Sequence, residues 1–206
     1  MKNDTRQRLI EEAIKLFAKY GVDSVSTRQI SSKAKVNICS ISYYFAGKEG
    51  LFEACVKHLI AESIESFYPL REQLKFISSN NSEDRNLWED LLRKYLRQTI
   101  SNILSANYRY RFQLFLREQV SESKYGSLYF KEVWWPLKED FIKIIEMLSN
   151  DKAADIIEIK FLNTVGMINS LFFSKNFFPK DQAEKSISSE FLDKYINHIV
   201  KVIELA

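Results

Sequence analysis

The sequence predicts an all-α fold, and three observations favour it. Glycine and proline are scarce, at 5 and 3 of 206 residues, although 46% of the residues are hydrophobic. Long stretches place apolar residues three or four positions apart, the spacing that gives a helix one apolar face. Polar breaks between these stretches are short, and only residues 78–86 resemble a linker. We therefore expect a small N-terminal cluster of three helices followed by a longer helical bundle.

Residues 4–20 predict the first helix. Leu9, Ala13, Leu16 and Phe17 fall on one stripe of that helix, and charged residues occupy the other side. Gly21 is the expected C-terminal stop, because glycine readily adopts the left-handed conformation that ends a helix.

Residues 26–51 predict two short helices joined by a tight turn, with a further helix directly behind them. Ser26 or Thr27 is expected to cap the first of the two. Ile30, Ala34 and Val36 are expected to face inward from the first helix and the turn, and Ile41, Tyr44 and Phe45 from the second helix. The opposite face shows short or planar polar groups, which suit base edges and phosphates: Asn37, Cys39, Ser40, Ser42 and Tyr43. This is the layout of a helix-turn-helix, whose second helix lies in the DNA major groove.

The charge distribution agrees with that interpretation. Residues 1–50 contain 9 Lys+Arg and 5 Asp+Glu, a net charge of +4. Residues 51–206 contain 21 and 22 of these residues, a net charge of −1. The basic excess therefore lies in the segment expected to meet the polyanion.

The N-terminal segment resembles the TetR family of transcriptional regulators. About a dozen positions agree in type and spacing: Ala13, Phe17, Gly21, Thr27, Ile30, Ala34, Val36, Ile41, Tyr44, Phe45, Lys48, Glu49 and Leu51. The segment LREQVSESKYGSLYFKEVWWPL resembles the C-terminal region of one subgroup, with less specificity. Two positions depart from the family pattern: Lys35 replaces a turn glycine, and Ser42 replaces a tyrosine that contacts phosphate.

The resemblance implies roles for particular residues. Thr27 and Arg28 would meet DNA from the first helix of the motif, and Asn37, Ser40 and Tyr43 from the recognition helix. Tyr44 and Lys48 would hold phosphate. Phosphate contacts fix the register on DNA, and only base contacts specify sequence.

The remaining chain predicts six more helical stretches. A helix from residue 48 to about 67 is expected to end or break at Pro69, and a helix over 128–148 to bend or split at Pro136. Residues 87–104 and 107–120 have plain helical spacing. The stretch 151–174 is apolar almost all round, so it must be covered on both sides. With the last helix, over 188–205, it is expected to form a four-helix dimer interface, as the resemblance also implies.

The aromatic residues of the C-terminal part suggest a largely apolar effector pocket. The residues proposed to bind the effector are Phe112, Phe115, Arg117, Trp134 and Phe172. Simple packing is the alternative for the aromatic residues, and a surface ion pair is the alternative for Arg117.

Other classes of protein find little support. The N-terminus lacks the apolar core of a signal peptide, and no segment is apolar enough to cross a bilayer. Two cysteines suit a reducing cytoplasm. A redox role for Cys39 is conceivable, but packing of Cys39 and Cys55 is the simpler interpretation. We found no motif for a metal site, a cofactor or an enzyme.

The sequence thus predicts a DNA-binding domain over residues 1–47 and an effector-binding and dimerisation domain over residues 48–206. The predicted function is that of a homodimeric cytoplasmic repressor, which a small hydrophobic or amphipathic effector releases from a pseudo-palindromic double-stranded DNA operator. Three alternatives remain open: an activator or effector-less regulator with a protein partner, a helical-bundle enzyme, and a DNA-packaging dimer without sequence preference.

Overall fold

The computed structural model describes residues 2–104, 106–120, 123–174 and 188–205. Every regular element in these ranges is helical, so the predicted all-α fold is confirmed. Contacts between helices divide the chain into two compact units. Unit 1 consists of residues 1–64 and 105–134, and unit 2 of residues 65–104 and 135–206.

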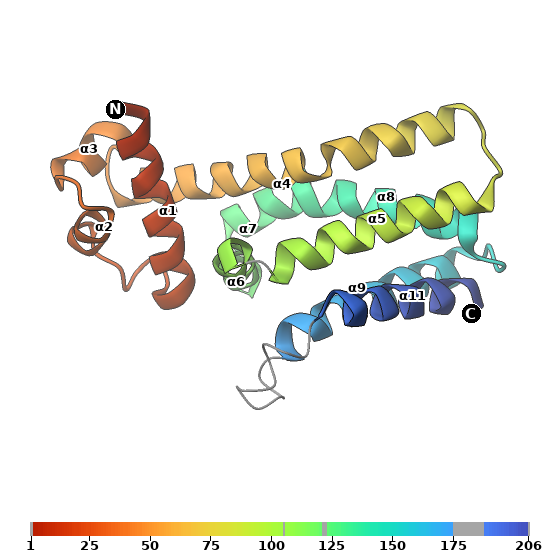
Figure 1. The fold of residues 1–206 in the computed structure, drawn as a ribbon. Coiled ribbons are helices and arrows are strands. Elements are labelled where there is room, and N and C mark those ends of the chain that lie inside the picture. Colours follow the sequence, from red (N-terminus) through yellow and green to blue (C-terminus); the bar gives the residue numbers. More distant parts are fainter. Residues whose placement is uncertain (1, 105, 121–122, 175–187, 206) are drawn as a thin grey trace. The chain divides into compact units, whose positions relative to one another are not determined.

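Unit 1 contains the N-terminal helices and two later ones. Its elements are α1 (Lys2–Tyr20), α2 (Thr27–Ala34), α3 (Cys39–Phe45), the first half of α4 (Lys48–Ser79), α6 (Ala106–Val120), α7 (Lys124–Tyr129) and a π-helical turn, η1 (Phe130–Trp134). Helices α1, α2 and α3 gather around the beginning of α4 (Figure 1), and α6 packs on α1.

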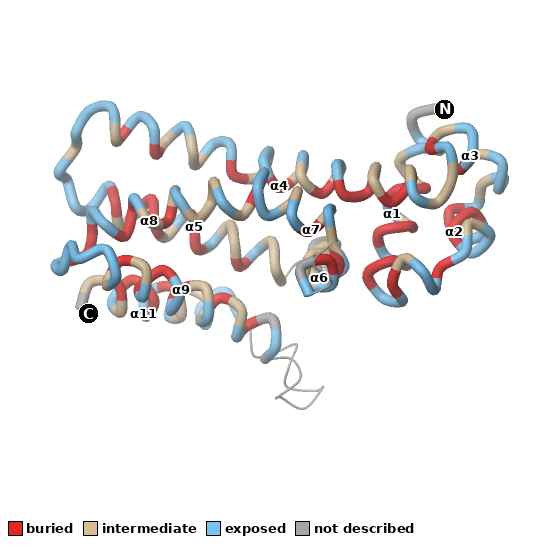
Figure 2. The backbone as a smooth tube through the Cα atoms, turned by 180° about the vertical axis from the view of Figure 1, so that it is seen from behind, coloured by how far each residue is buried: buried red, intermediate tan, exposed pale blue. Residues whose placement is uncertain are grey.

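The core of unit 1 is built from the apolar faces that the sequence predicts. Leu9, Phe17, Ile30, Ile41 and Leu51 are almost completely buried. Figure 2 shows buried stretches, in red, along α1 and at the beginning of α4. The rings of Phe17 and Phe52 meet edge to face at 5.3 Å, an arrangement that suits the charge distribution of aromatic rings. This core fixes α2 and α3 against α1 and α4.

Unit 2 is a bundle of long helices. It comprises the second half of α4, α5 (Arg85–Leu104), α8 (Trp135–Leu148), α9 (Ala154–Ser174) and α11 (Ser189–Leu205). Helices α5, α8, α9 and α11 lie side by side in both views (Figures 1 and 2), and each contacts the others. Tyr95 of α5 lies at the centre, with Phe67 and Phe141 around it.

The predicted end of a helix at Pro69 is wrong. Helix α4 continues through Pro69 to Ser79. Proline lacks the N–H group that would bond the carbonyl of Glu65, but both residues are exposed, so water can reach this region of the backbone. The break predicted near Pro136 does occur: η1 separates α7 from α8, and Pro136 is the second residue of α8, where proline is well tolerated.

The division into units does not follow the predicted boundary between residues 47 and 48. The contacts group α6 and α7 with the N-terminal helices, whereas the predicted boundary marks where the DNA-binding residues end. That boundary remains a prediction about function. Among the described residues, no helix combines the length and apolarity needed to span a bilayer.

Candidate nucleic-acid interface

The start of α2 is fixed by a capping box. The Ser26 hydroxyl accepts a hydrogen bond from the Gln29 amide at 3.2 Å, and the Gln29 side chain accepts one from the Ser26 amide at 2.8 Å. Ser26, one of the two residues proposed as the cap, is therefore the N-cap. Thr27 and Arg28 form the first turn of α2, and Arg28 is exposed. Arg28 makes no ion pair in the described part of the chain.

The turn between α2 and α3 is tight and left-handed. Lys35 has φ 53° and ψ 48°, and the amide of Val36 donates to the carbonyl of Ser31 at 3.0 Å. A non-glycine residue in this conformation costs about 1 kcal/mol or more. The turn thus keeps the helix-turn-helix geometry without the glycine that the family pattern contains.

Helix α3 presents a polar face to solvent and an apolar face to the core. Ile41 and Phe45 are buried, while Cys39, Ser42 and Tyr43 are exposed, Tyr43 by 72%. Ser40 and Tyr44 are half-buried between the two faces. The Tyr43 and Tyr44 rings meet edge to face at 4.8 Å. The exposed face therefore combines hydroxyl donors and acceptors with a large planar side chain.

Asn37 was predicted to lie on the recognition helix. It lies instead in the turn before α3, because that helix begins at Cys39. Its side-chain oxygen accepts a hydrogen bond from the Cys39 amide at 2.9 Å, which closes a local turn that leads into the helix. The NH2 group of the Asn37 side chain takes no part in that bond and carries two N–H donors. Ile38, the next residue, is 43% exposed and was not among the residues predicted to contact DNA. An apolar side chain in this place can contact a thymine methyl group.

Two residues fix the start of α4 against the motif. The Lys48 ammonium group donates to the carbonyl of Val22 at 3.0 Å, leaving two of its three N–H groups available for phosphate. Gly50 lies directly against the last turn of α3, because a Cβ atom on it would come within 1.9 Å of the Phe45 carbonyl oxygen. Only glycine fits this contact. The sequence analysis did not single out Gly50.

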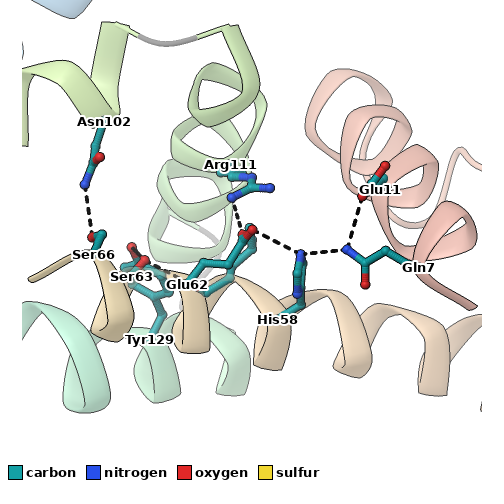
Figure 3. A network of polar contacts seen from close by, with 10 residues as sticks. Gln7, Glu11, His58, Glu62, Ser63, Ser66, Asn102, Arg111 and Tyr129 are labelled. Carbon is teal, nitrogen blue, oxygen red and sulfur yellow. Dashed lines mark hydrogen bonds and ion pairs between the residues drawn. The ribbon is translucent and has the colours of Figure 1, made fainter. Parts of the chain in front are cut away.

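Figure 3 shows a series of polar side-chain contacts that the sequence did not predict. His58 Nε2 lies 3.3 Å from Gln7 Nε2 and 3.4 Å from Glu62 Oε1, and Arg111 pairs with the other oxygen of Glu62. These contacts join α1, α4 and α6 through groups about 50 positions apart in the sequence. No local pattern could reveal them, because none of these residues interrupts the helical spacing.

Most of the residues proposed to bind an effector lie in unit 1. The rings of Phe112 and Phe115 are 6.3 Å apart, Phe115 lies 4.5 Å from Tyr129, and Trp134 lies 6.5 Å from Phe130. Arg117 is exposed and lies against Gly21 at the end of α1. The side chain of Phe172 lies outside the described residues. The assignment of these residues to an effector remains a prediction.

The described ranges contain no metal site, and the two cysteines differ in exposure. Within those ranges, His, Cys, Asp and Glu form no group that could hold a metal ion. Cys55 is completely buried, and burial raises the pKa of its thiol, which keeps it protonated and unreactive. Cys39 is exposed on α3.

Comparisons with known proteins agree with this geometry. Residues 9–55 match the sequence pattern of the bacterial regulatory proteins of the tetR family. The HTH-type transcriptional regulator YttP of Bacillus subtilis is 35% identical over 111 residues, which cover 54% of this chain and 47% of YttP. The dual regulator CecR of Shigella flexneri is 27% identical over 150 residues, covering 73% of this chain and 67% of CecR. The chain thus spans about half to two thirds of the length of these relatives.

A solved structure extends the likeness to the whole chain. A transcriptional regulator of Saccharomonospora viridis in complex with choline superposes with a TM-score of 0.63, covering 98% of this chain and 97% of that one at 13% identity. At this identity the likeness shows the fold alone. Residues 9–55, with their exposed polar face, therefore form the helix-turn-helix DNA-binding domain of the TetR family of transcriptional regulators. The relatives that match further along the chain are themselves named as transcriptional regulators.

Proposed function

We propose that the chain binds a pseudo-palindromic operator as a homodimer and represses transcription until a small hydrophobic or amphipathic effector releases it. The observation that carries the DNA-binding step is the exposed face of α2 and α3. It gathers Arg28, Lys33 and Lys35, which lack ion pairs within the described ranges, beside the hydrogen-bonding groups of Ser42 and Tyr43. Cations of this kind supply affinity for phosphate, and the side chains of α3 supply base readout.

The residues proposed to contact bases are Arg28, Asn37, Ser40 and Tyr43. Thr27, Tyr44 and Lys48 are proposed to contact the backbone. Arg28 is long and forms no ion pair with a described residue, which suits bidentate contact with guanine. Lys48 remains close to the backbone of its own chain at Val22, which holds its ammonium group at the edge of the motif.

Dimerisation is proposed through α9 and α11. Helix α9 buries one face within unit 2 and exposes Ile159 by 51%, Leu162 by 57% and Phe173 by 44%, and α11 exposes Phe191 by 41%. Gly166 lies among the exposed residues of α9 with no atom within 4 Å of a Cβ placed on it, so a second helix can approach closely there. A second copy would cover this apolar surface, and a two-fold dimer would present two α3 helices to successive major grooves.

Effector release is supported by the choline complex of the structural relative and by the aromatic residues of α6, α7 and η1. The mechanism would be a shift of population: an effector that binds better to a state with misplaced reading helices lowers operator affinity by the same factor. The alternative, an activator or an effector-less regulator acting through a protein partner, predicts no stabilisation by small molecules in a thermal screen. Either regulator would act in the cytoplasm.

Footprinting tests the proposal directly. Purified protein is incubated with the DNA flanking its own gene and with genomic fragments selected by binding, against excess competitor. A protected pseudo-palindrome with half-sites one helical turn, or a multiple, apart is the expected result. Diffuse protection at every fragment would instead support the packaging dimer without sequence preference.

A further inference from the structure

A groove of about 650 Å³ lies in unit 1 between α1, α3 and α4. Arg6 forms one wall from α1, residues 42–46 at the end of α3 form the second, and Glu53 and Lys57 form the third from α4. Ser42 and Tyr43 belong both to this groove and to the face of α3 proposed to meet DNA. The groove therefore opens beside the candidate interface.

The walls of the groove are held in place by contacts outside it. Gln7, next to Arg6, contacts His58 at 3.3 Å, as Figure 3 shows, which joins α1 to α4. The Cys55 thiol donates to the carbonyl of Ile10 at 3.6 Å. Gly50 packs on the carbonyl of Phe45 and joins α4 to α3. The groove is thus a preformed feature of the packing of three helices.

The polar groups left free in the groove are hydrogen-bond donors. The Arg6 guanidinium lies over the Phe45 ring, 5.4 Å from its centroid, and forms no ion pair with a described residue. The hydroxyl groups of Tyr43 and Tyr44 have no hydrogen-bond partner in the described part of the protein. Glu53, the only acidic residue of the lining, is paired with Lys57 at 2.7 Å. A matching occupant carries negative charge and acceptor oxygens.

We propose that this groove receives a phosphate of the operator backbone and that Arg6 is its principal contact. The inference rests on the proposed operator binding and adds a contact from α1, outside the helix-turn-helix. A recognition helix in the major groove has a phosphodiester strand along its flank, and Ser42 and Tyr43 extend from that surface into the groove. The planar Arg6 guanidinium can donate two parallel hydrogen bonds to one phosphate.

The contact with Phe45 prepares Arg6 for this role. A cation over an aromatic ring is held by the negative face of the ring. Part of the side-chain entropy that a free arginine would lose on binding is therefore already lost. The ring leaves the N–H groups at the edge of the guanidinium available, because it contacts only one face of that group.

The test is the salt dependence of operator affinity, measured by fluorescence anisotropy from about 50 to 300 mM KCl. Each phosphate neutralised contributes about 0.9 to the slope of log K against log salt. We expect Arg6→Gln to lower the magnitude of this slope by about 0.9 while keeping the preference for operator over scrambled DNA. Arg6→Lys should keep the wild-type slope. Lys15→Gln is the matched control, because Lys15 lies on the same helix and is paired with Glu12 at 2.7 Å, so its slope should remain that of the wild type.

Several outcomes would overturn the inference, and they are distinguishable. A wild-type slope in Arg6→Gln would exclude Arg6 as a phosphate contact while leaving operator binding intact. Operator binding absent in the wild type would overturn the proposed function itself. Inorganic phosphate that stabilises the DNA-free wild type but not Arg6→Gln, together with an unchanged slope on DNA, would assign the groove to a free anion. Thermal melts of each variant identify unfolding, and Arg6→Lys tests the same contact with the charge preserved.

Discussion

The exposed face of α2 and α3 and the interior of unit 2 both contain charged residues, but they use them in opposite ways. On the exposed face, Arg28, Lys33 and Lys35 extend into solvent without ion-pair partners in the described ranges. Inside unit 2, Asp140 accepts hydrogen bonds from Arg71 at 2.7 Å and from Tyr95 at 3.2 Å. Charges left free are available to a ligand, whereas charges paired in the interior hold helices together.

Lys160 is a second charged residue of unit 2 that is hydrogen-bonded inside the protein. It is 2% exposed on α9, and its ammonium group donates to the Ser149 hydroxyl and to the carbonyl of Ile203, both at 2.6 Å. Burial lowers its pKa, because desolvation disfavours the charged form. The bond to Ile203 satisfies a carbonyl in the last turn of α11, a favourable place for a cation. Asp140 and Lys160 therefore have structural explanations, whereas the cations of α2 and α3, which form no ion pair with a described residue, are available to a ligand.

The largest effect on stability and operator affinity is expected at Gly50, where α4 packs on the last turn of α3. Gly50→Ala puts a Cβ atom into the Phe45 carbonyl oxygen, so the end of α3 must move. We expect the free energy of unfolding to fall by about 2–4 kcal/mol and operator affinity to be lost. Denaturant unfolding and anisotropy measure both quantities. Glu49→Ala is the control, because Glu49 is exposed in the same turn of α4 and outside the contact with Phe45; equal losses in the two variants would contradict the account.

The exposed face of α9 provides the next test. Leu162→Arg places a charge in the proposed dimer interface, and we expect monomers by analytical ultracentrifugation and an operator affinity at least about 100-fold weaker, because two half-sites no longer bind together. Phe76→Arg is the matched control: Phe76 is 70% exposed on α4, outside that interface. A Leu162→Arg protein that remains dimeric would remove α9 from the interface.

Arg28→Ala tests whether an unpaired cation on the exposed face reads bases. Loss of a bidentate contact with guanine should cost about 1–3 kcal/mol of operator affinity and relax the preference at one base pair. Binding to a set of single-base operator variants measures this. Uniform weakening on every sequence would make Arg28 a phosphate contact instead.

A smaller effect, this time an increase in stability, is expected at the left-handed turn between α2 and α3. Lys35→Gly removes the strain of a side chain at φ 53°, so we expect the free energy of unfolding to rise by about 1 kcal/mol. Lys33→Gly makes the same change inside α2, where glycine should lower stability by about 1 kcal/mol. Urea unfolding of the two variants gives the comparison. A decrease in both would mean that Lys35 is not strained.

The smallest effect concerns the half-buried Asp140. Burial raises its pKa above the ordinary 3.8, although the hydrogen bond and the charge of Arg71 oppose the shift. A raised carboxyl pKa contributes stability that is fully present below pH 3.8 and is lost as pH rises through the folded-state pKa. Asp140→Asn lacks this dependence on protonation. Its stability relative to the wild type should therefore increase as the pH rises from 3.8 through the raised pKa of Asp140, measured by unfolding at each pH. A flat difference would show that the pKa of Asp140 is unchanged on folding.

The sequence predicted what repeated local patterns encode. The amphipathic spacing around Leu9 and Phe17, and the cap at Ser26, lead directly to buried faces and helix starts. Pro69 was misjudged because the cost of proline in a helix depends on exposure, which the sequence does not state. The prediction that Asn37 lies on the recognition helix is wrong because a polar residue of the preceding turn and a residue of the first helical turn look alike in the sequence.

Other features depend on the folded chain. The Gln7–His58–Glu62–Arg111 chain, the Lys160 contacts and the groove beside Arg6 each join residues far apart in sequence. Arg6 looks like one more charged residue on the solvent side of a helix until the structure places it over Phe45. For Gly50, the signal was available: a glycine in the first turn of a long helix requires a reason, and close approach of the backbone is one.

The central claim is that the exposed face of α2 and α3 reads DNA sequence. The most direct measurement is the affinity of the wild-type protein for its selected operator and for a scrambled duplex of equal length, at about 0.15 M salt. A ratio of about 1,000 or more is the result that the account predicts. A ratio close to one, with a steep salt dependence for both duplexes, would contradict it and leave only non-specific attraction to phosphate.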